Sequence, residues 1–279
     1  MHTKTIDFSK YSSFKIGPTV DVSLLEHSTQ NYNEYYLIGA CNNTLVGPHT
    51  PPLMLLSKDF NYIKIENDTL HIGGATPSGK IASFCKKNNI ANFEFLSHLP
   101  GKLGGLVQMN AGLKEYEIFN QLKYITTPTG IKQKDSLHFG YRFTNIKEPI
   151  LEAAFRLEYG YSVQKLQMFY EMRANQPSTP SAGSCFKNPP GDYAGRLIEA
   201  VGLKGIKRGA MCFSQEHANF LVNHGGGNFE DALWLIQEAQ DRVYSEFGIW
   251  LECEIIVLDK RYMGSDSPLL APKQSTLKN

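Results

Sequence analysis

Residues 181–205 read SAGSCFKNPPGDYAGRLIEAVGLKG. Small residues surround one hydroxyl, Ser184, a Lys-Asn-Pro turn follows, and the stretch ends in a short apolar-periodic run that Gly202 can stop as a helix. Ser184 lies between Gly183 and Cys185 and not in a GxSxG elbow, so a serine nucleophile is not supported. A serine that donates a proton or a hydrogen bond stays open, beside a buried serine that the backbone satisfies.

Composition and charge narrow the class of protein. The chain has 279 residues, of which 42% are hydrophobic and 20% charged, which is enough apolar material for a substantial core. Its 28 Lys and Arg residues balance 27 Asp and Glu residues, so nothing indicates a nucleic-acid footprint or a polybasic membrane patch. We therefore expect neither a nucleic-acid nor a membrane partner.

The N-terminal segment and the cysteines bear on location. The segment MHTKTIDFSKYSSFKIG has no continuous apolar core of a signal peptide, and no run in the chain approaches the roughly 20 apolar residues that span a bilayer. The five cysteines are scattered, with no CxxC pair and no Cys/His cluster at zinc-ligand spacing. We expect free thiols in a reducing cytoplasm and no metal site.

The texture of the chain changes near residue 161. Before it, short apolar runs stopped by Gly, Asn and Pro predict strands, with a hairpin over 122–133. After it, helical periodicity is clearest over 228–248, where Asn228 can cap the start and Gly248 can stop the end. Other predicted elements are helices over 78–90, 163–176 and 194–202, a strand over 249–259, and a disordered tail over 261–279. The fold class that this indicates is α+β.

Two Gly-rich segments are candidates for binding a phosphate. LPGKLGGLVQMNAG, residues 99–112, allows a sharply turning backbone that exposes N–H groups, but it is neither a P-loop nor a GxGxxG fingerprint. IGACNNTLVGP, residues 38–48, follows an apolar run and contains Asn residues that tolerate a left-handed backbone. Taken singly, each segment favours a structural turn, and phosphate binding stays the alternative.

Several polar residues could carry chemistry. Arg142 follows Tyr141 in an apolar segment and could hold a carboxylate with its fork, although a surface ion pair is commoner. Strand alternation predicts Glu252 and Glu254 on one face, where both meet solvent or one meets a site that needs an acid. His217 could contact a ligand or be a satisfied structural residue.

The order of these segments resembles the UDP-N-acetylenolpyruvoylglucosamine reductases, also called UDP-N-acetylmuramate dehydrogenases, of bacterial peptidoglycan synthesis. The resemblance runs from about residue 14 to about residue 256 and is similar to the shorter form of the family. It rests most on SAGSCFKNP followed by AGRLIEAVGLKG, with LPGKLGGLVQMNAG, Tyr141-Arg142, SQEHANFLVN and LECE in support.

The resemblance implies an FAD-binding domain of the vanillyl-alcohol-oxidase (PCMH) type over residues 1–160, in two lobes of about 1–56 and 57–160. It implies a substrate-binding α+β domain over 161–260. Non-covalent FAD is the implied cofactor and NADPH the hydride donor. The residues that correspond to the family's FAD contacts are Gly39, Ala40, Cys41, Asn42, Asn43, Pro100, Gly101, Gly104, Gly105, Asn110, Ala111 and Gly112.

The resemblance also implies a reaction, the reduction of UDP-N-acetylglucosamine enolpyruvate to UDP-N-acetylmuramate by a monomeric cytoplasmic enzyme. Hydride would pass from NADPH to flavin N5, and from N5 to the vinyl carbon in a second, ping-pong step. Arg142 and Glu254 would stabilise the enolate that develops, and Ser184 would protonate the adjacent carbon. The implied substrate contacts are Tyr141, Lys187, Asn188 and His217.

The sequence departs from the family pattern in places. The first Gly-rich turn usually has three glycines and a serine, and here it reads Gly39-Ala40-Cys41-Asn42; in the second loop, Lys102 stands where a small residue is usual. Two alternatives therefore stay open. One is an FAD-dependent oxidase of the same superfamily, and the other is a nucleotide-sugar-binding module that has lost its flavin.

Overall fold

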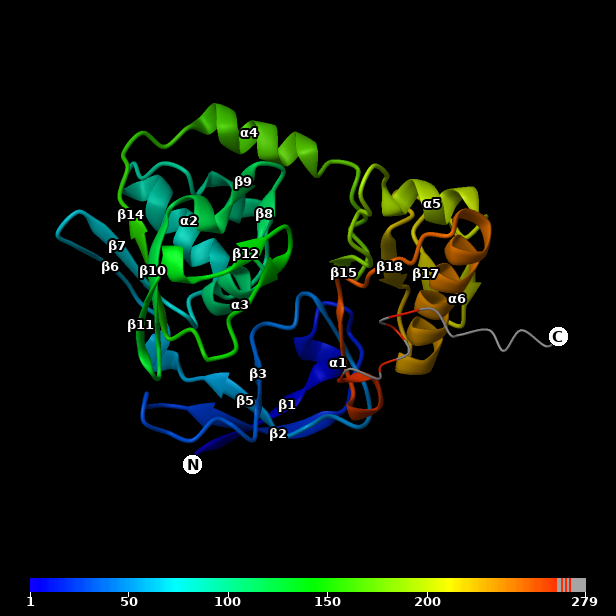
Figure 1. The fold of residues 1–279 in the computed structure, drawn as a ribbon, viewed down its shortest axis with the longest axis horizontal. Coiled ribbons are helices and arrows are strands. Elements are labelled where there is room, and N and C mark those ends of the chain that lie inside the picture. Colours follow the sequence, from blue (N-terminus) through cyan, green and yellow to red (C-terminus); the bar gives the residue numbers. More distant parts are fainter. Residues whose placement is uncertain (265–266, 268, 270, 272–279) are drawn as a thin grey trace. The chain divides into compact units, whose positions relative to one another are not determined.

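The computed structural model describes residues 1–264, 267, 269 and 271, and its helices and strands form an α+β protein (Figure 1). The chain divides into two compact units, each discontinuous in sequence. Unit one comprises Met1–Lys4, Asp21–Ala40 and Pro52–Ala174, and unit two comprises Thr5–Val20, Cys41–Pro51 and Asn175–Asn279.

A division at residue 160 does not anticipate this discontinuity. Two early segments of the chain belong with the C-terminal half because their apolar side chains, Phe14, Ile16 and Leu45, are part of the core of unit two. Contacts of this kind join residues far apart in sequence, and local patterns carry no signal for them.

The main sheet of unit one has the strand order β11-β10-β14-β7-β6. Its strands are β6 (Ile63–Glu66), β7 (Thr69–Gly73), β10 (Leu122–Thr127), β11 (Gly130–Gln133) and β14 (Glu152–Arg156). Residues alternate between the two faces, so Leu70 and Ile72 face a hydrophobic core while His71 faces away and bonds Glu152 at 3.0 Å. The predicted hairpin over 122–133 is confirmed as β10 and β11.

Helices complete the core of unit one on the face of Leu70 and Ile72. Helix α2 (Ser78–Lys87) contributes Ile81 and Cys85 to this core, and α3 (Leu103–Gln108) contributes residues 103, 106 and 107. The other elements of the unit are η1 (Lys58–Phe60), η2 (Glu94–His98), β8 (Gly112–Leu113), β9 (Tyr116–Glu117), η3 (Ile118–Asn120), η4 (Lys134–Ser136), β12 (Phe139–Gly140), β13 (Phe143–Thr144) and α4 (Val163–Met172).

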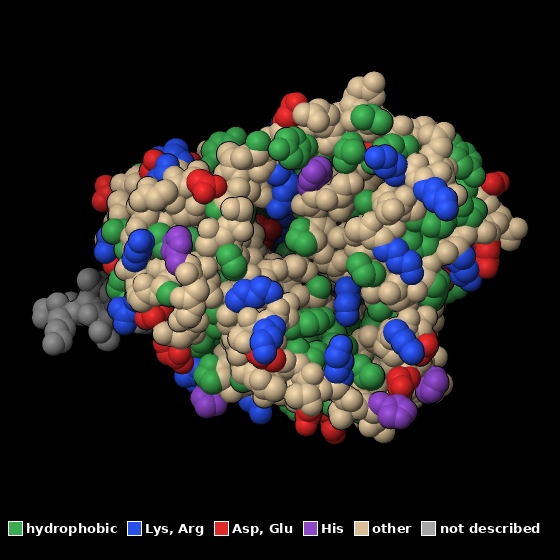
Figure 2. Space-filling model, turned by 180° about the vertical axis from the view of Figure 1, so that it is seen from behind, with side chains coloured by type: hydrophobic (Ala, Val, Ile, Leu, Met, Phe, Trp, Pro, Cys, Tyr) green, Lys and Arg blue, Asp and Glu red, His purple; other side chains and the backbone are tan. Residues whose placement is uncertain are grey.

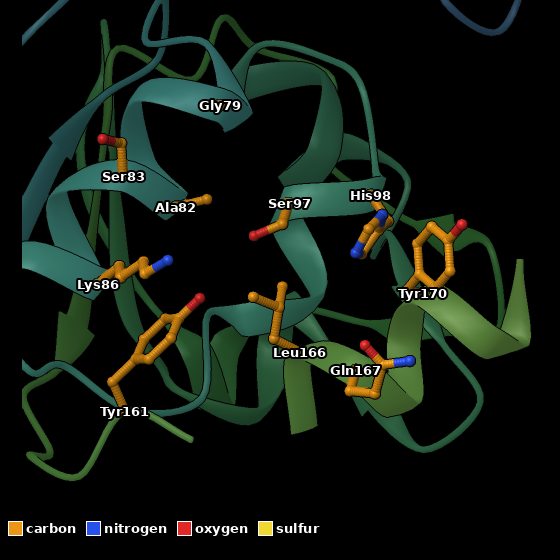
Figure 3. A pocket seen from close by; sticks show the side chains of 10 residues that line it. All are labelled: Gly79, Ala82, Ser83, Lys86, Ser97, His98, Tyr161, Leu166, Gln167 and Tyr170. Carbon is orange, nitrogen blue, oxygen red and sulfur yellow. The ribbon is translucent and has the colours of Figure 1, made fainter. Parts of the chain in front are cut away.

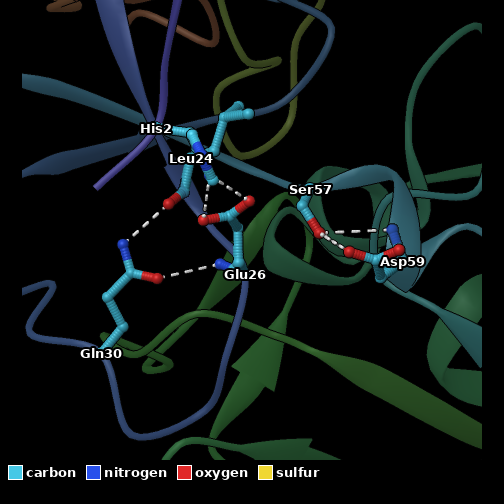
Figure 4. A network of polar contacts seen from close by, with 6 residues as sticks. All are labelled: His2, Leu24, Glu26, Gln30, Ser57 and Asp59. Carbon is cyan, nitrogen blue, oxygen red and sulfur yellow. Dashed lines mark hydrogen bonds and ion pairs between the residues drawn. The ribbon is translucent and has the colours of Figure 1, made fainter.

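A smaller sheet has the order β1-β2-β5-β3, from β1 (Thr3–Asp7), β2 (Thr19–Leu25), β3 (Tyr36–Ile38) and β5 (Leu53–Leu56). The chain that leaves β2 is fastened by side chains (Figure 4). Gln30 donates to the carbonyl of Leu24 at 2.7 Å and accepts from the backbone N–H of Glu26 at 3.0 Å. His2 Nδ1 lies 2.9 Å from the Glu26 carboxylate, and Ser57 caps η1 through Asp59 N.

Unit two is built on the sheet β15-β18-β17-β16. Met211, Phe213 and Leu221 on one face join the core that helices α5 and α6 cover, while Phe220 and Val222 face the opposite side. The elements of this unit are α1 (Phe8–Tyr11), β4 (Thr44–Val46), β15 (Ser181–Ser184), α5 (Ala194–Ala200), β16 (Lys207–Arg208), β17 (Met211–Phe213), β18 (Phe220–Asn223), α6 (Phe229–Phe247), β19 (Ile256–Leu258) and η5 (Lys260–Tyr262).

Helix α6 confirms its prediction at both ends. Asn228 Oδ1 accepts from the N–H of Asp231 at 2.8 Å, and Gly248 ends the helix at φ +67°. The predicted tail is different. Residues 260–262 form η5, and Leu269 is buried in the core, where its carbonyl accepts from Gln240 at 3.0 Å. The prediction of disorder is therefore wrong for these positions; residues 265–266, 268, 270 and 272–279 lie outside the described part.

Candidate active site

Ser184 ends strand β15, and the backbone before it bends sharply. The strand pairs with β18 at Ser181–Val222 and at Ser184–Phe220, and the register shifts between these two pairs. Gly183 adopts φ +78°, and no heavy atom lies within 4 Å of the place where its Cβ would be. The backbone angle, and not a lack of space, therefore requires glycine here. The bulge sets the direction of the half-buried Ser184.

A cavity of about 300 Å³ in unit two contains Ser184. Asn188 and His217 line the same cavity, so the structure brings together three residues that the sequence singled out. Two cations, Arg196 and Lys204, also line it, and sequence reasoning missed them. The remaining lining residues are Tyr193, Gly195, Glu199, Glu216, Ala218 and Asn219.

The side chains of this cavity are held by the backbone around them. Asn188 Oδ1 accepts from the N–H of Ala194 at 3.0 Å and so fixes the start of α5. Buried Asn219 bonds both the N–H and the carbonyl of Phe186, at 3.0 and 2.8 Å. These bonds join the segment after Ser184 to the residue that precedes β18, which keeps the hydroxyl in a defined place.

His217 presents one ring nitrogen to the cavity side. Its Nδ1 lies 3.2 Å from the N–H of Asn219, whose donation leaves the proton of a neutral ring on Nε2. Burial, with a smaller contribution from Lys204, lowers the pKa of His217 below its usual value. The ring lies so close to Gly195 that a Cβ there would be 3.3 Å from Cε1. The imidazole is therefore a neutral donor in a fixed position.

The two cations of the cavity are paired with carboxylates on the protein surface. Arg196 Nε donates to Asp192 at 2.7 Å, and hydrogen bonding from Arg196 lowers the pKa of Asp192 to about 2. Lys204 donates to Glu199 at 3.0 Å. Exposed pairs of this kind contribute about 1 kcal/mol or less, so an anionic ligand can draw the cations away at small cost.

Glu254 lies beside Ser184, but not on a strand. Its N–H donates to the carbonyl of Cys185 at 2.9 Å, and Asn43 Nδ2 donates to its carbonyl at 2.8 Å. The predicted strand over 249–259 is reduced to β19, because Cys253 forms an isolated bridge with Phe186 and the chain bends at residues 254–255. The prediction that alternation puts Glu252 and Glu254 on one face is therefore wrong.

Glu252 instead faces solvent, where the predicted ligand residue Lys187 donates to it at 2.6 Å. The Glu252 side chain is 68% exposed, whereas Glu254 is half-buried. The backbone N–H of Lys187 also donates to the carbonyl of Glu252, at 2.9 Å. Of the two residues, Glu254 is the half-buried one, and its backbone bonds Cys185, the residue directly after Ser184.

Arg142, in unit one, occupies the two-residue turn between β12 and β13. Its φ is +54°, a left-handed conformation that a side chain other than Gly, Asn or Asp rarely adopts. Its Nη2 donates to the carbonyl of Gly112 at 2.9 Å, and its guanidinium lies 5.1 Å from the Tyr141 ring centre. Burial and the charge of Arg142 together lower the pKa of Arg173, a second cation that sequence reasoning missed.

The second Gly-rich segment is partly helical. Gly104 and Gly105 lie inside α3, so the prediction of an open loop is wrong for them. A Cβ on Gly104 would lie 3.3 Å from the carbonyl oxygen of Gly74, which explains glycine there by close packing on β7. Gly105 has no heavy atom within 4 Å of its Cβ position. Pro100 and Gly101 precede the helix, with Gly101 at φ +159°.

The end of this segment, 110–112, is held by the protein itself. Asn110 is fully buried, and its amide donates to Glu117 at 2.7 Å and to the carbonyl of Gly140 at 3.1 Å. A Cβ on Gly112 would lie 2.4 Å from the carbonyl oxygen of Tyr116, so the β8–β9 hairpin requires glycine there. The N–H of Ala111 donates to the carbonyl of Leu106 at 2.8 Å.

The first Gly-rich turn, 39–43, passes from unit one to unit two between residues 40 and 41. No heavy atom lies within 4 Å of a Cβ position on Gly39, and Cys41 adopts φ +50°. Asn42 Nδ2 donates to Ser13 Oγ at 2.6 Å. The turn therefore combines open space at its glycine with a left-handed residue that is held by its neighbours.

The surface charge, the cysteines and the helices bear on the predictions made from composition. On the face drawn in Figure 2, Lys and Arg side chains are spread among uncharged ones, and some lie beside Asp or Glu side chains. All five cysteines lie in the described part and none is in a disulfide. Among the described residues, no group of three or more His, Cys, Asp or Glu could hold a metal ion. None of the described helices is long and apolar enough to cross a membrane.

Comparison with known proteins gives one consistent result. Residues 175–258 match the family model "UDP-N-acetylenolpyruvoylglucosamine reductase, C-terminal domain". A UDP-N-acetylenolpyruvoylglucosamine reductase of Helicobacter pylori is 45% identical over 254 residues, covering 91% of this chain and 98% of its own length. A protein of the same name from Campylobacter jejuni is 44% identical over 258 residues, covering 91% of this chain and 99% of its own.

A solved structure agrees. The crystal structure of the UDP-N-acetylenolpyruvylglucosamine reductase (MurB) from Thermus caldophilus superposes with a TM-score of 0.82 at 26% identity. It covers 92% of this chain and 99% of its own.

Proposed function

The chain belongs to the UDP-N-acetylenolpyruvoylglucosamine reductase family, and from this premise we propose that it reduces UDP-N-acetylglucosamine enolpyruvate to UDP-N-acetylmuramate in peptidoglycan synthesis. We propose FAD as its non-covalent cofactor and NADPH as its hydride donor. The observation that carries the proposal is the cavity of unit two, where a hydroxyl on a glycine bulge lies with a neutral His donor and two cations.

The residues present fit a bound flavin nucleotide. Gly39 and Gly105 leave open space where side chains would stand, and the left-handed Cys41 lies two residues after the first of them. Backbone N–H groups without side chains beside them are suited to phosphate groups. When bound, FAD would supply hydride transfer to the substrate. Asn110 and Gly112 make their hydrogen bonds and close contacts within the protein, so their proposed role is to hold the end of the segment 99–112 in place.

Ser184 is the proposed proton donor. Its hydroxyl is held next to a bulge, and Asn219 anchors the following residues, so the proton is kept at one place. Hydride addition to the vinyl carbon leaves negative charge on the neighbouring carbon and its carboxylate. A hydroxyl is a weak acid, but such a carbon is a far stronger base, so proton transfer from Ser184 Oγ is downhill once aligned.

Arg142 and Glu254 are the proposed stabilisers of the enolate. The Arg142 fork offers several N–H donors that match a carboxylate, and Glu254 in its protonated form would add one more hydrogen bond. Tyr141, stacked on Arg142, is proposed to keep that guanidinium in place beside the substrate.

The nucleotide part of the substrate is proposed to use the remaining groups of the unit-two cavity. Arg196 and Lys204 are suited to a diphosphate, and Asn188 and His217 to sugar or phosphate oxygens. Tyr193 is 69% exposed and offers a flat face for the base. Lys187, already bonded to Glu252, is a weaker candidate than sequence alone suggested. We further propose a monomer that works in the cytoplasm.

The test is an anaerobic visible spectrum of the purified protein, taken before and after NADPH and again after the enolpyruvyl UDP-sugar. We expect a yellow protein that bleaches with NADPH and recolours with the sugar. A reduced flavin that ignores the sugar but consumes oxygen would favour the oxidase alternative. A protein that stays colourless after incubation with FAD would favour the flavin-less binding module.

A further inference from the structure

We propose that unit one carries a second ligand site, separate from the reductase site, that binds a small planar anion such as an aryl phosphate. The site is a cavity of about 510 Å³ between helices α2 and α4, here called the α2–α4 cavity (Figure 3). Its volume is within the range of cavities that hold small molecules. None of the residues that line it belongs to the proposed reductase site, so the inference stands whether or not the proposed reductase activity is correct.

The cavity exists because α2 turns a face of small residues towards it. Gly79, Ala82 and Ser83 lie three and four residues apart and share one side of the helix, with Lys86 one turn further on. Leu166 of α4 stands opposite and supplies an apolar wall. Larger residues on this face of α2 would close the space.

Three polar groups converge at one end. In Figure 3 the ammonium of Lys86 and the hydroxyls of Ser97 and Tyr161 point towards the same space. Lys86 makes no ion pair with any residue that the structure describes. A cation flanked by two hydroxyls matches the oxygens of a phosphate or carboxylate.

The other end suits a flat ring. The imidazole of His98 and the ring of Tyr170 lie 5.9 Å apart between centres and are tilted by 57°. Burial, and secondarily the charge of Arg173, lowers the pKa of His98, so this ring is neutral. These two rings offer an aromatic surface for the body of the ligand.

The test uses the full chain as purified and 1-naphthyl phosphate as the probe, with binding measured by isothermal titration calorimetry. We expect a dissociation constant below 1 mM, on the order expected for a site with one charge-assisted contact. Lys86→Ala should weaken binding about tenfold, and Ser83→Leu should fill the cavity and abolish binding. The matched control is Lys87→Ala, the adjacent exposed lysine of α2, which should bind like the unaltered protein.

Ser83 and Lys86 are both exposed on α2, so these variants should fold, which circular dichroism would verify. Neutral 1-naphthol should bind at least tenfold more weakly than the phosphate. The proposal is overturned if the probe does not bind at millimolar concentration. It is equally overturned if Lys86→Ala and Ser83→Leu bind like the unaltered protein, since the probe then lies elsewhere.

Discussion

Two of the proposed catalytic side chains, Ser184 and Arg142, lie at tight turns of the backbone. The two turns differ in which residue adopts the left-handed conformation. In unit two, Gly183 takes the left-handed conformation at φ +78°, and Ser184, the proposed proton donor, follows it and pairs with Phe220. In unit one, Arg142 is itself left-handed at φ +54°. In the first turn the glycine has the left-handed backbone and the next residue has the proposed catalytic side chain. In the second turn one residue, Arg142, has both. The two turns should therefore respond differently to substitution.

The largest effect is expected from removing the hydroxyl. Ser184→Ala should lower turnover with the enolpyruvyl sugar by about 10²–10⁴-fold, the usual contribution of a positioned acid. The matched control is Ser181→Ala, at the other end of β15, which should keep turnover within a factor of three. Steady-state assays of NADPH oxidation measure both. A loss below tenfold in Ser184→Ala would mean that another group supplies the proton.

The next effect separates the two carboxylates near the Ser184 turn. Glu254→Gln should lower turnover by about 10²-fold, because a hydrogen bond to the developing enolate is lost or misplaced. Glu252→Gln should leave it unchanged, because that side chain is 68% exposed and pairs with Lys187. The same assay compares them. Equal losses in both variants would contradict the placement of Glu254 alone in the site.

A smaller effect is expected from the backbone conformations of the two turns, and it concerns the free energy of unfolding. Gly183→Ala should lower the free energy of unfolding by about 1–2 kcal/mol, since alanine disfavours the left-handed region. Arg142→Gly should change it by less than about 1 kcal/mol, because relief of the backbone offsets the lost bond to Gly112. Turnover should nevertheless collapse in Arg142→Gly. Urea unfolding gives the free energies, and equal destabilisation would remove the distinction.

The smallest expected effect is a pH dependence. The pKa of His217 is lowered mainly by burial, so between its lowered pKa and the usual value near 6.5 the unfolded chain binds more protons than the folded one. Stability should therefore fall as the pH decreases below about 6.5. His217→Asn should make the fall shallower, leaving the share of His98, whose pKa is also lowered. Urea midpoints from pH 5 to pH 7.5 test this, and an identical slope in the variant would contradict it.

The sequence predicted elements whose signals are local. Helix α6 has its cap, its stripe and its stop within one stretch, and the β10–β11 hairpin has its turn between its strands. The predictions from sequence were wrong where contacts between distant segments determine the local structure. Gly104 lies in the first turn of helix α3 with its N–H bonded to the carbonyl of Gly74 at 2.8 Å, and the strand expected over 249–259 is interrupted where Cys253 forms an isolated bridge with Phe186.

The candidate site shows the same limit. The motif around Ser184 named that residue and Asn188, the separate segment SQEHANFLVN named His217, and the structure places all three at one cavity. Arg196 and Lys204 stood in the quoted stretch, but only folding shows which of its charges line the cavity. No sequence pattern indicated Arg173, because the lowering of its pKa arises from its burial and from the charge of Arg142, which only the folded structure brings near it.

The most direct test of the central claim follows the two half-reactions of Ser184→Ala separately by anaerobic stopped-flow. We expect that NADPH bleaches the flavin at the rate of the unaltered protein, while recolouring by the enolpyruvyl UDP-sugar slows by about 10²-fold or more. If both half-reactions slow equally, or if recolouring keeps its rate, Ser184 is not the proton donor and the role assigned to the Gly183–Ser184 turn is wrong.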